Sequence, residues 1–337
     1  MAICSFVCIS KRIAILFGIF ILILFCLKFG TIQKQEKLNP SSKVECSLSI
    51  SSARNIFWDE RKETIQNLPF SATFKNKSGV RIIFNRVPKC GSRSLVNVVQ
   101  NLVDQNQVNL IHSQVYNKTE LSEAQKSLIV DVLPNLDPPF VFHRHMFYID
   151  FRKHSIVPVK YINIIRDPIE RATSEYYFRR FGDEETEKDF KGSDLYQTIN
   201  ECVLGNKAEC IGNNLQYIIP FFCGDSPECL TLNSRVPLEI AKQNVERDFI
   251  MVGLLEDFRS TVAVLEKLLP EVFNGAANYL TNPNTNFNCR KGKYVTKYKV
   301  PPTDEVRAIL YQEMALEYEF FEFIKQRLNK QKQSLGI

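Results

Sequence analysis

The segment "VRIIFNRVPKCGSRSLVNVVQNL", residues 80–102, indicates the class of fold. It begins as a short, apolar, β-branched run that predicts a buried strand, and it ends with apolar residues at helical spacing. The loop between these elements contains one glycine, two serines and three cations, Arg86, Lys89 and Arg93. A strand, a flexible basic loop and a helix in this order indicate a site for a phosphate-like anion. A solvated basic turn is the alternative.

Strands and helices keep alternating further along the chain. Residues 138–151 predict a second strand, and residues 159–181 predict a third strand, a turn at Asp167-Pro168 and a helix. Residues 245–273 predict a strand followed by an amphipathic helix, and residues 304–328 predict one long helix. This alternation predicts an α/β fold with a mostly parallel central sheet that is flanked by helices.

The composition suits one large folded domain or two small ones. The chain has 337 residues, of which 45% are hydrophobic and 24% are charged, and its formal net charge is +6. This positive balance predicts an anionic partner. Because the charge is spread along the chain without a long basic tail, it does not predict binding to nucleic acid.

The N-terminal part contains an apolar run, residues 13–30, in which Lys28 is the only charge. The run with its flanks approaches the roughly 20 residues that cross a bilayer, and no small-x-small cleavage site follows it. We therefore expect a retained signal anchor rather than a cleaved signal peptide, with Lys11 and Arg12 on the cytosolic side. The expected order is a cytosolic tail (1–12), a transmembrane signal anchor (13–30), a lumenal stem (31–75) and a folded domain (76–337).

Seven cysteines follow this run, and four of them form two close pairs. The pairs are Cys202 with Cys210, and Cys223 with Cys229. Such spacings favour small disulfide loops in an oxidising compartment, whereas the alternative, a zinc site, usually has shorter spacings. Cys46, Cys90 and Cys289 have no predicted partner. Glycosylation sequons at Asn76 and Asn117 fit the same lumenal placement.

The basic loop differs from an ATP-binding loop in the order of its residues. In a Walker A motif the lysine follows the glycines, but here Lys89 precedes Gly91, and no acidic Mg²⁺ motif is apparent. The loop therefore predicts anion binding without a metal ion. Arg166, at the end of the third predicted strand, and Ser174, in the helix after it, predict a second anion site. An arginine–aspartate pair that holds the turn is the alternative.

The chain has four histidines, and two of them, His143 and His145, alternate in the second predicted strand. Alternate strand residues share a face, which allows an acid/base pair or two metal ligands. A polar strand face is the third interpretation. A metal site needs a third ligand, and His112 is the remote candidate. We expect His154 to lie at the surface.

Four motifs, "NRVPKCGSRS", "FHRH", "YINIIRDPIERATSEYYFRRFGD" and "IPFFCGDSPEC", together resemble the uronyl 2-O-sulfotransferases of glycosaminoglycan synthesis. The resemblance runs in order from about residue 80 to the C-terminus. It implies a P-loop-kinase-like sulfotransferase fold, preceded by one N-terminal transmembrane helix. It also implies a single-pass type II Golgi membrane protein with a lumenal catalytic domain. The implied sulfate donor is 3′-phosphoadenosine 5′-phosphosulfate (PAPS), with no metal ion.

The resemblance implies a role for each matching residue. Lys89 holds the donor's 5′-phosphosulfate and assists the leaving group. The following residues, Cys90, Gly91, Ser92, Arg93 and Ser94, complete the donor loop. The 3′-phosphate is bound by Arg166 and Ser174, and a late donor-binding segment contains Arg290 and Lys291. His145 is the catalytic base and His143 its neighbouring catalytic candidate. The acceptor sugar faces Arg86, His112 and His143.

Two branches of this family differ in their acceptor, which is heparan sulfate in one and dermatan or chondroitin sulfate in the other. "KCGSR", "FRRFGD", "NECVLGN" and "ILYQEMALEYEFFEF" resemble the dermatan/chondroitin branch, whereas "RVPK" and His143 resemble the heparan branch. We therefore expect transfer to iduronate or glucuronate of dermatan or chondroitin sulfate. Heparan sulfate is the alternative acceptor, and a non-catalytic glycan-binding relative is an alternative of another class. The heparan branch further implies a homotrimer.

Overall fold

The computed structural model describes most of the expected folded domain. The described residues are 54–59, 79–115, 119–155, 157–182, 190, 192–215, 217–282, 285, 296 and 298–337. Several predicted features lie outside these ranges: the tail, the signal anchor, Asn76, Asn117, Arg290, Lys291, Cys46 and Cys289. Within the described ranges, none of the helices combines the length and the apolar character that a membrane span requires.

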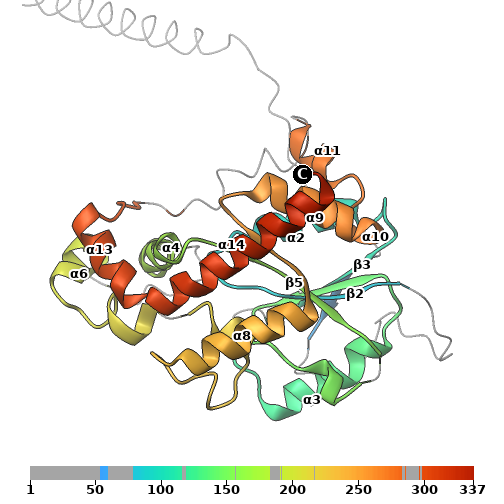
Figure 1. Ribbon diagram of the computed structural model, residues 1–337, viewed down its shortest axis with the longest axis horizontal. Coiled ribbons are helices and arrows are strands. Elements are labelled where there is room, and N and C mark those ends of the chain that lie inside the picture. The colour runs from blue at the N-terminus through green and yellow to red at the C-terminus, as the bar shows by residue number, and fades with distance from the viewer. Residues whose placement is uncertain are drawn as a thin grey trace, which may run out of the picture. The chain divides into compact units, whose positions relative to one another are not determined.

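A six-stranded sheet forms the centre of the domain (Figure 1). In spatial order its strands are β1 (Asn55–Trp58), β3 (Asn109–Ser113), β4 (Phe140–Arg144), β2 (Arg81–Asn85), β5 (Lys160–Ile165) and β6 (Phe249–Leu254). Every pairing between these strands is parallel. The predicted α/β fold is therefore confirmed, and so are the predicted strands that became β2, β4, β5 and β6.

Helices lie on both sides of the sheet in Figure 1. The longer ones are α2 (Ser92–Leu102), α3 (Glu123–Val132), α4 (Pro168–Phe181), α8 (Arg235–Asp248), α9 (Phe258–Leu268), α13 (Asp304–Glu313) and α14 (Ala315–Leu335). The shorter ones are α5 (Ser193–Tyr196), α6 (Ile199–Leu204), α7 (Pro220–Cys223), α10 (Pro270–Phe273) and α11 (Ala276–Thr281). Short 3₁₀ turns cover Leu133–Asn135, Phe151–Lys153 and Gly212–Leu215. The last helix, α14, packs against β6, α8 and α9.

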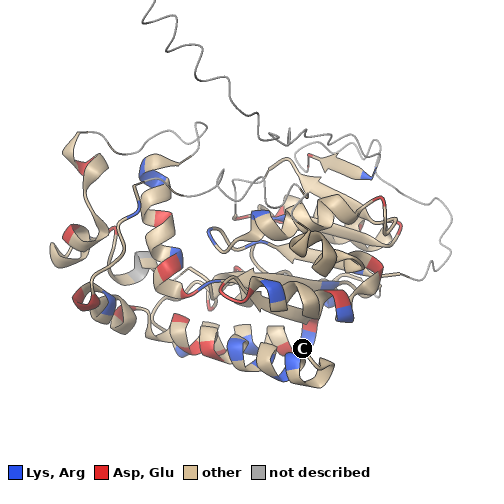
Figure 2. Ribbon diagram, turned by 90° about the horizontal axis from the view of Figure 1, so that it is seen from above, with Lys and Arg blue, Asp and Glu red and all other residues tan. Residues whose placement is uncertain are grey.

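The central strands are buried on both faces, as a parallel sheet between helices requires. Ile82, Ile83 and Phe84 of β2 are completely buried, which explains why this strand reads as a continuous apolar run. Charged residues remain on the surrounding helices, and Figure 2 shows acidic and basic residues interspersed along them. The basic character of the candidate site therefore arises from a few local cations rather than from one extended basic helix face.

Two strands escaped the sequence analysis. Residues 55–58 fall within the range expected to form a stem, but they form β1 and pair with β3 at the edge of the sheet. This corrects the prediction for those four residues. The strand β3, which contains His112, also gave no recognisable signal. Both strands are short: β1 has three apolar residues in succession and β3 has only two, too few to mark a strand without the contacts of the fold.

The predicted single helix over residues 304–328 is also corrected, because it is broken into α13 and α14. The break falls at Met314, whose φ of −107° and ψ of 23° leave the helical region. The two halves bury their apolar residues in different places. Val306 and Leu310 of α13 join a small cluster with α4 and α6, whereas Phe320 of α14 joins the main core. One straight helix would not reach both clusters.

Both predicted disulfides are present, Cys202–Cys210 and Cys223–Cys229. Cys202 and Cys210 lie in the small apolar cluster beneath α4 and α13, and Cys223 and Cys229 lie in the main core. The predicted pairing is therefore confirmed over the alternative of a zinc site. Among the described cysteines, Cys90 is free and buried.

We expect the double variant Cys202→Ala/Cys210→Ala to lose about 2–3 kcal/mol of unfolding free energy, because the bridge closes a short loop and so restricts the unfolded chain. The measurement is the urea midpoint of the oxidised wild type and of the variant. Reductant should lower the midpoint of the wild type more than that of the variant, which keeps only the second bridge. Equal midpoints in the two oxidised proteins would show that this bridge does not stabilise the fold.

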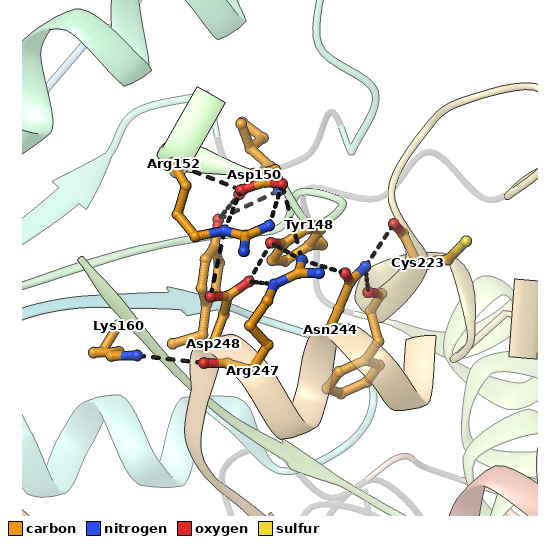
Figure 3. A network of polar contacts seen from close by, with 11 residues as sticks. Tyr148, Asp150, Arg152, Lys160, Cys223, Asn244, Arg247 and Asp248 are labelled. Atoms are coloured by element: carbon orange, nitrogen blue, oxygen red, sulfur yellow. Dashed lines mark hydrogen bonds and ion pairs between the residues drawn. The ribbon is translucent and has the colours of Figure 1, made fainter. Parts of the chain in front are cut away.

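A polar network at the amino edge of the sheet joins the segment after β4 to the end of α8 (Figure 3). Tyr148 donates to the Asp248 carboxylate, and the Arg247 guanidinium donates to Asp248 at 2.9 Å and to Asn244 at 2.6 Å. The Asn244 amide in turn donates to the carbonyl of Cys223 at 3.1 Å. Because Asp248 immediately precedes β6, this network lies at the edge opposite the carboxyl ends of the strands. It anchors the fold rather than the candidate site.

Candidate active site

The predicted site residues lie near the carboxyl ends of β2, β4 and β5. They thus share the edge of the sheet at which its parallel strands end. Because β2 lies between β4 and β5, the loops that follow these strands are neighbours. The Arg86 amide donates to the Arg144 carbonyl at 2.8 Å, and the Asn163 side chain donates to the Asn85 carbonyl at 2.6 Å. These bonds fix the strand ends together. Ligands of parallel α/β folds bind at this edge.

The backbone of the basic loop turns sharply before α2. Lys89 and Gly91 both have left-handed backbones, with φ values of 65° and 77°. A side chain at Gly91 would also collide with Leu255, so this position requires glycine for two reasons. A left-handed lysine carries a conformational strain of about 1–3 kcal/mol, and such strain concentrates at functional sites. The turn brings the start of α2 to the edge of the sheet.

The side chains of the loop differ in their contacts and in their burial. The Lys89 ammonium lies 3.5 Å from the centre of the Phe178 ring, a cation–π contact with α4. Ser92 is buried and accepts a hydrogen bond from Arg86 Nε at 3.1 Å. Burial raises the pKa of the Cys90 thiol to about 12, so the thiol stays protonated. Cys90 is therefore a packing residue of the loop and not a nucleophile.

Two further loop residues lie at the first turn of α2. The Ser94 amide donates to the Gly91 carbonyl at 2.9 Å, which closes the turn into the helix. Arg93 is exposed at the second position of α2. Gly91 caps the helix without a side-chain hydrogen bond, so no side chain of the cap occupies the helix N-terminus.

Arg166 follows β5 directly, and its guanidinium lies 3.3 Å from the Glu170 carboxylate. The pair is therefore made one turn into α4, and not with the neighbouring aspartate. Glu170 also contacts Lys299 at 2.8 Å and Arg307 at 2.7 Å. Burial disfavours its charge, but the hydrogen bonds from these two cations outweigh burial and lower its pKa to about 2. Three cations share one carboxylate, which leaves a positive excess, and Ser174 lies buried one turn further along α4.

His145 lies just beyond β4 and is held by the backbone of the basic loop. Its Nδ1 atom is 2.8 Å from the Arg86 carbonyl oxygen. A carbonyl only accepts, so Nδ1 carries the proton and Nε2 keeps its lone pair. Burial, followed by the positive charge of Arg86, lowers the pKa of His145 to about 3. The imidazole is therefore neutral at neutral pH, with Nε2 able to accept a proton.

His143 and His112 lie beside this imidazole and contact each other. His143 Nε2 is 2.8 Å from His112 Nδ1, and His143 Nδ1 is 3.4 Å from the Arg86 guanidinium. A metal ion bound at the usual distance of about 2 Å from each nitrogen would hold the two nitrogens further apart. The two rings therefore share a hydrogen bond rather than a metal ion. Among the described residues, no other group of histidine, cysteine, aspartate and glutamate forms a metal cluster.

Two residues at this edge were not predicted from the sequence. Asn55 Oδ1 lies 3.1 Å from His112 Nε2, and the Phe57 ring stacks on His112 with centroids 4.7 Å apart. Both belong to β1, in the segment expected to be a stem, so no signal marked them. The other predicted site residues that the structure describes lie near the carboxyl ends of the strands, or in the loops and helices that follow these strands. His154 is exposed, as expected.

The fold and this edge together define an α/β protein with a strained basic loop, a second cluster of cations and a neutral imidazole that can accept a proton. Such a site is suited to transferring a group from an anionic donor. A model of the sulfotransferase family matches residues 73–324, and the chain belongs to this family.

Two groups of individual relatives within this family are similar to the chain. The chain is 36% identical over 265 residues to the uronyl 2-sulfotransferases of Mus musculus and Homo sapiens, covering 76% of this chain and 64% of theirs. It thus spans just under two thirds of the length of these relatives. It is also 32% identical over 319 residues to heparan sulfate 2-O-sulfotransferase 1 of Gallus gallus, covering 92% of this chain and 85% of the other.

Proposed function

We propose that the protein transfers a sulfuryl group from PAPS to the 2-hydroxyl of a uronic acid in dermatan or chondroitin sulfate. The observation that carries this proposal is the orientation of His145. Its Nδ1–H is fixed on the Arg86 carbonyl, which leaves Nε2 as a base at the same sheet edge as the Lys89 loop. The family match and the two groups of 2-O-sulfotransferase relatives support the same reaction.

The residues at this edge fit the donor's two anionic ends. The strained loop at Lys89 and Gly91 presents backbone and ammonium groups of the kind that bind a phosphosulfate. The excess of cations around Glu170 suits the 3′-phosphate, which Arg166 would bind by turning from the carboxylate. Ser174, Arg290 and Lys291 join this subsite in the proposal. PAPS, when bound, supplies the sulfuryl group and a phosphate leaving group.

The proposed chemistry divides between two residues. His145 Nε2 accepts the proton of the sugar 2-hydroxyl, while that oxygen attacks the sulfur in line with the departing phosphate oxygen. Lys89 stabilises the negative charge that develops on this departing oxygen. Burial and then the positive charge of Arg86 lower the pKa of His145, and anionic ligands bound near Arg86 would offset the second of these causes and make the histidine a stronger base.

The acceptor assignment rests on the sequence motifs and on the two groups of relatives. Arg86 and His112 face the uronate in this proposal, and their positive and polar character suits a carboxylated, sulfated polymer. The similarity to uronyl 2-sulfotransferases, at 36% identity, favours the dermatan/chondroitin assignment, whereas heparan sulfate 2-O-sulfotransferase 1 is matched at 32%.

The acceptor is tested by measuring kcat/KM on desulfated dermatan, chondroitin and heparan polymers in the same assay with PAPS. We expect dermatan or chondroitin to be preferred by about tenfold or more, as for a site shaped to one polymer. A preference for heparan would reassign the protein to the other branch. Binding of the polymers without turnover on any of them would instead indicate a non-catalytic glycan-binding protein.

We also propose that the domain lies in the Golgi lumen, anchored by residues 13–30 as a type II membrane protein. The two disulfides support this location, because such bridges form and persist in oxidising compartments of the secretory route. The apolar run and the cations before it supply the anchor and its orientation. From the resemblance to the heparan branch, we further propose that the protein forms a homotrimer.

A further inference from the structure

Four side chains at the acceptor side of the site form one chain of polar contacts. Asn55 Oδ1 lies 3.1 Å from His112 Nε2, and His112 Nδ1 lies 2.8 Å from His143 Nε2. His143 Nδ1 lies 3.4 Å from a terminal nitrogen of Arg86. Arg86 and His143 are buried, and the rings of His112 and His143 meet edge to face. The chain thus runs from the edge strand β1 to the guanidinium beside His145.

Arg86 sets the direction of every hydrogen bond in this chain. A guanidinium only donates, so His143 Nδ1 must accept and cannot carry a proton. A neutral His143 then carries its proton on Nε2 and donates to His112 Nδ1. A neutral His112 in turn carries its proton on Nε2 and donates to Asn55 Oδ1. Reversing any link would place two donors face to face, so the direction does not depend on how the asparagine amide is oriented.

Because the hydrogen bonds run in this direction, His143 and His145 differ in their capacity to accept a proton from a substrate. Both nitrogens of His143 are occupied, by Arg86 on one side and His112 on the other, so His143 has no lone pair left for a substrate. His145 uses only Nδ1, on the Arg86 carbonyl, and keeps Nε2. The predicted pair of catalytic histidines therefore separates into a base, His145, and a residue that orients Arg86.

We propose that Asn55 is a positioning residue, which accepts the last hydrogen bond of this chain and thereby holds the ring of His112 and, through it, the positions of His143 and Arg86. The expected effect on activity rests on the proposed function, whereas the expected tautomers do not depend on that function. The Phe57 ring stacks on a face of the His112 ring, with an interplanar angle of 15°, and so also restrains its orientation. β1 is thus part of the site and not a connection to it.

The charged groups that face the chain all favour neutral rings. Burial and Arg86 lower the pKa of His112 to about 4, and they lower the pKa of His143 further below its ordinary value. Arg93 and Arg144 add positive charge near His145. Burial lowers the pKa of Arg86 to about 10, so its guanidinium remains charged at neutral pH and continues to donate.

The direct test is a nitrogen–proton correlation spectrum of the full-length chain labelled on histidine, which has only four such residues. At neutral pH we expect His112 and His143 to be neutral with the proton on Nε2, and His145 to be neutral with the proton on Nδ1. A protonated His143, or a His143 with its proton on Nδ1, would overturn the proposal. This result is independent of any enzymatic activity.

The kinetic test replaces Asn55 in two ways. Asn55→Leu removes the acceptor and leaves the His112 Nε2–H without a partner, so we expect kcat/KM for the acceptor to fall about tenfold with the donor KM unchanged. Asn55→Asp restores an acceptor, and its activity should match that of the wild type above neutral pH. On the acid side its activity should fall at a higher pH than in the wild type, because the new carboxylate raises the pKa of His112. A protonated His112 would turn a second donor toward His143.

Asn109→Leu is the matched control, because Asn109 begins β3 and its side-chain oxygen accepts from Arg54 at 3.5 Å rather than from a histidine. It tests the same substitution in the same pair of strands. Loss of activity in Asn109→Leu equal to that in Asn55→Leu would overturn the proposal, and so would an unchanged pH profile in Asn55→Asp. If the wild type sulfates no uronate polymer, the proposed function fails, while a comparison of the histidine spectra of the wild type and Asn55→Leu still decides the role of Asn55: an unchanged His112 signal in the variant would overturn it.

Discussion

The variant His145→Ala is expected to lose about 10²- to 10⁴-fold in kcat, because it removes the base that we propose accepts the proton of the sugar hydroxyl. The loss should fall on kcat and not on substrate binding. The His145 ring bonds to the Arg86 carbonyl and not to its guanidinium, so its removal leaves the bonds of the guanidinium to Ser92 and His143 in place. The measurements are steady-state kinetics with PAPS and the preferred polymer, together with the affinity for each substrate at equilibrium.

His154→Ala is the matched control, because this histidine is exposed after the short helix that ends at Lys153. It should keep the kcat of the wild type. The pH profile adds a second check, since the free enzyme's kcat/KM should lack an acid limb near pH 6.5 if the pKa of His145 is about 3. Full turnover in His145→Ala, with polymer sulfated at the wild-type rate, would rule out His145 as the base.

The variant Lys89→Met is expected to lose about 10²- to 10³-fold in kcat/KM for the donor, because it removes the positive charge that we propose stabilises the leaving phosphate. Methionine keeps much of the length of lysine and can still contact the Phe178 ring. Loss of the charge is therefore separated from loss of packing. The measurement is donor kinetics at a saturating concentration of acceptor, with the melting temperature recorded for both proteins.

Lys160→Met supplies the control for this experiment. Lys160 begins β5 at the opposite edge of the sheet and donates to the Arg247 carbonyl at 3.3 Å. The same substitution there should leave donor kinetics unchanged. If Lys89→Met lost no more activity than Lys160→Met, the charge of Lys89 would have no part in the reaction, and the donor would have to be bound by other groups.

The parts of the fold that could be predicted from the sequence have strong local signals. The run from Arg81 to Leu102 contains its own strand, turn and helix, and the left-handed positions fall at Lys89 and Gly91 within the predicted loop. The same holds for β5 and α4, where Asp167 caps the helix and Pro168 begins it. In these segments neighbouring residues determine the structure, so the sequence pattern is sufficient.

The parts that escaped prediction depend on contacts between distant residues. Asn55 and His112 are separated by 57 positions, and the meaning of each appears only when β1 pairs with β3. His143 looked equivalent to His145 in the sequence, but Arg86 and His112 occupy both of its nitrogens. Glu170 marked the first turn of α4, but nothing in the sequence marked it as the partner of several cations, because Lys299 and Arg307 come from the other end of the chain.

Transfer of sulfate to the 2-position of a uronate can be measured on the polymer itself. The full-length protein is incubated with radiolabelled PAPS and 2-O-desulfated dermatan sulfate, the polymer is digested to disaccharides, and the position of the label is mapped. We predict that the label enters disaccharides that carry a 2-O-sulfated uronate, and that the His145→Ala protein yields almost none. Label confined to other positions, or no labelled disaccharide from dermatan, chondroitin or heparan polymers, would show that the protein does not sulfate the 2-position of their uronates.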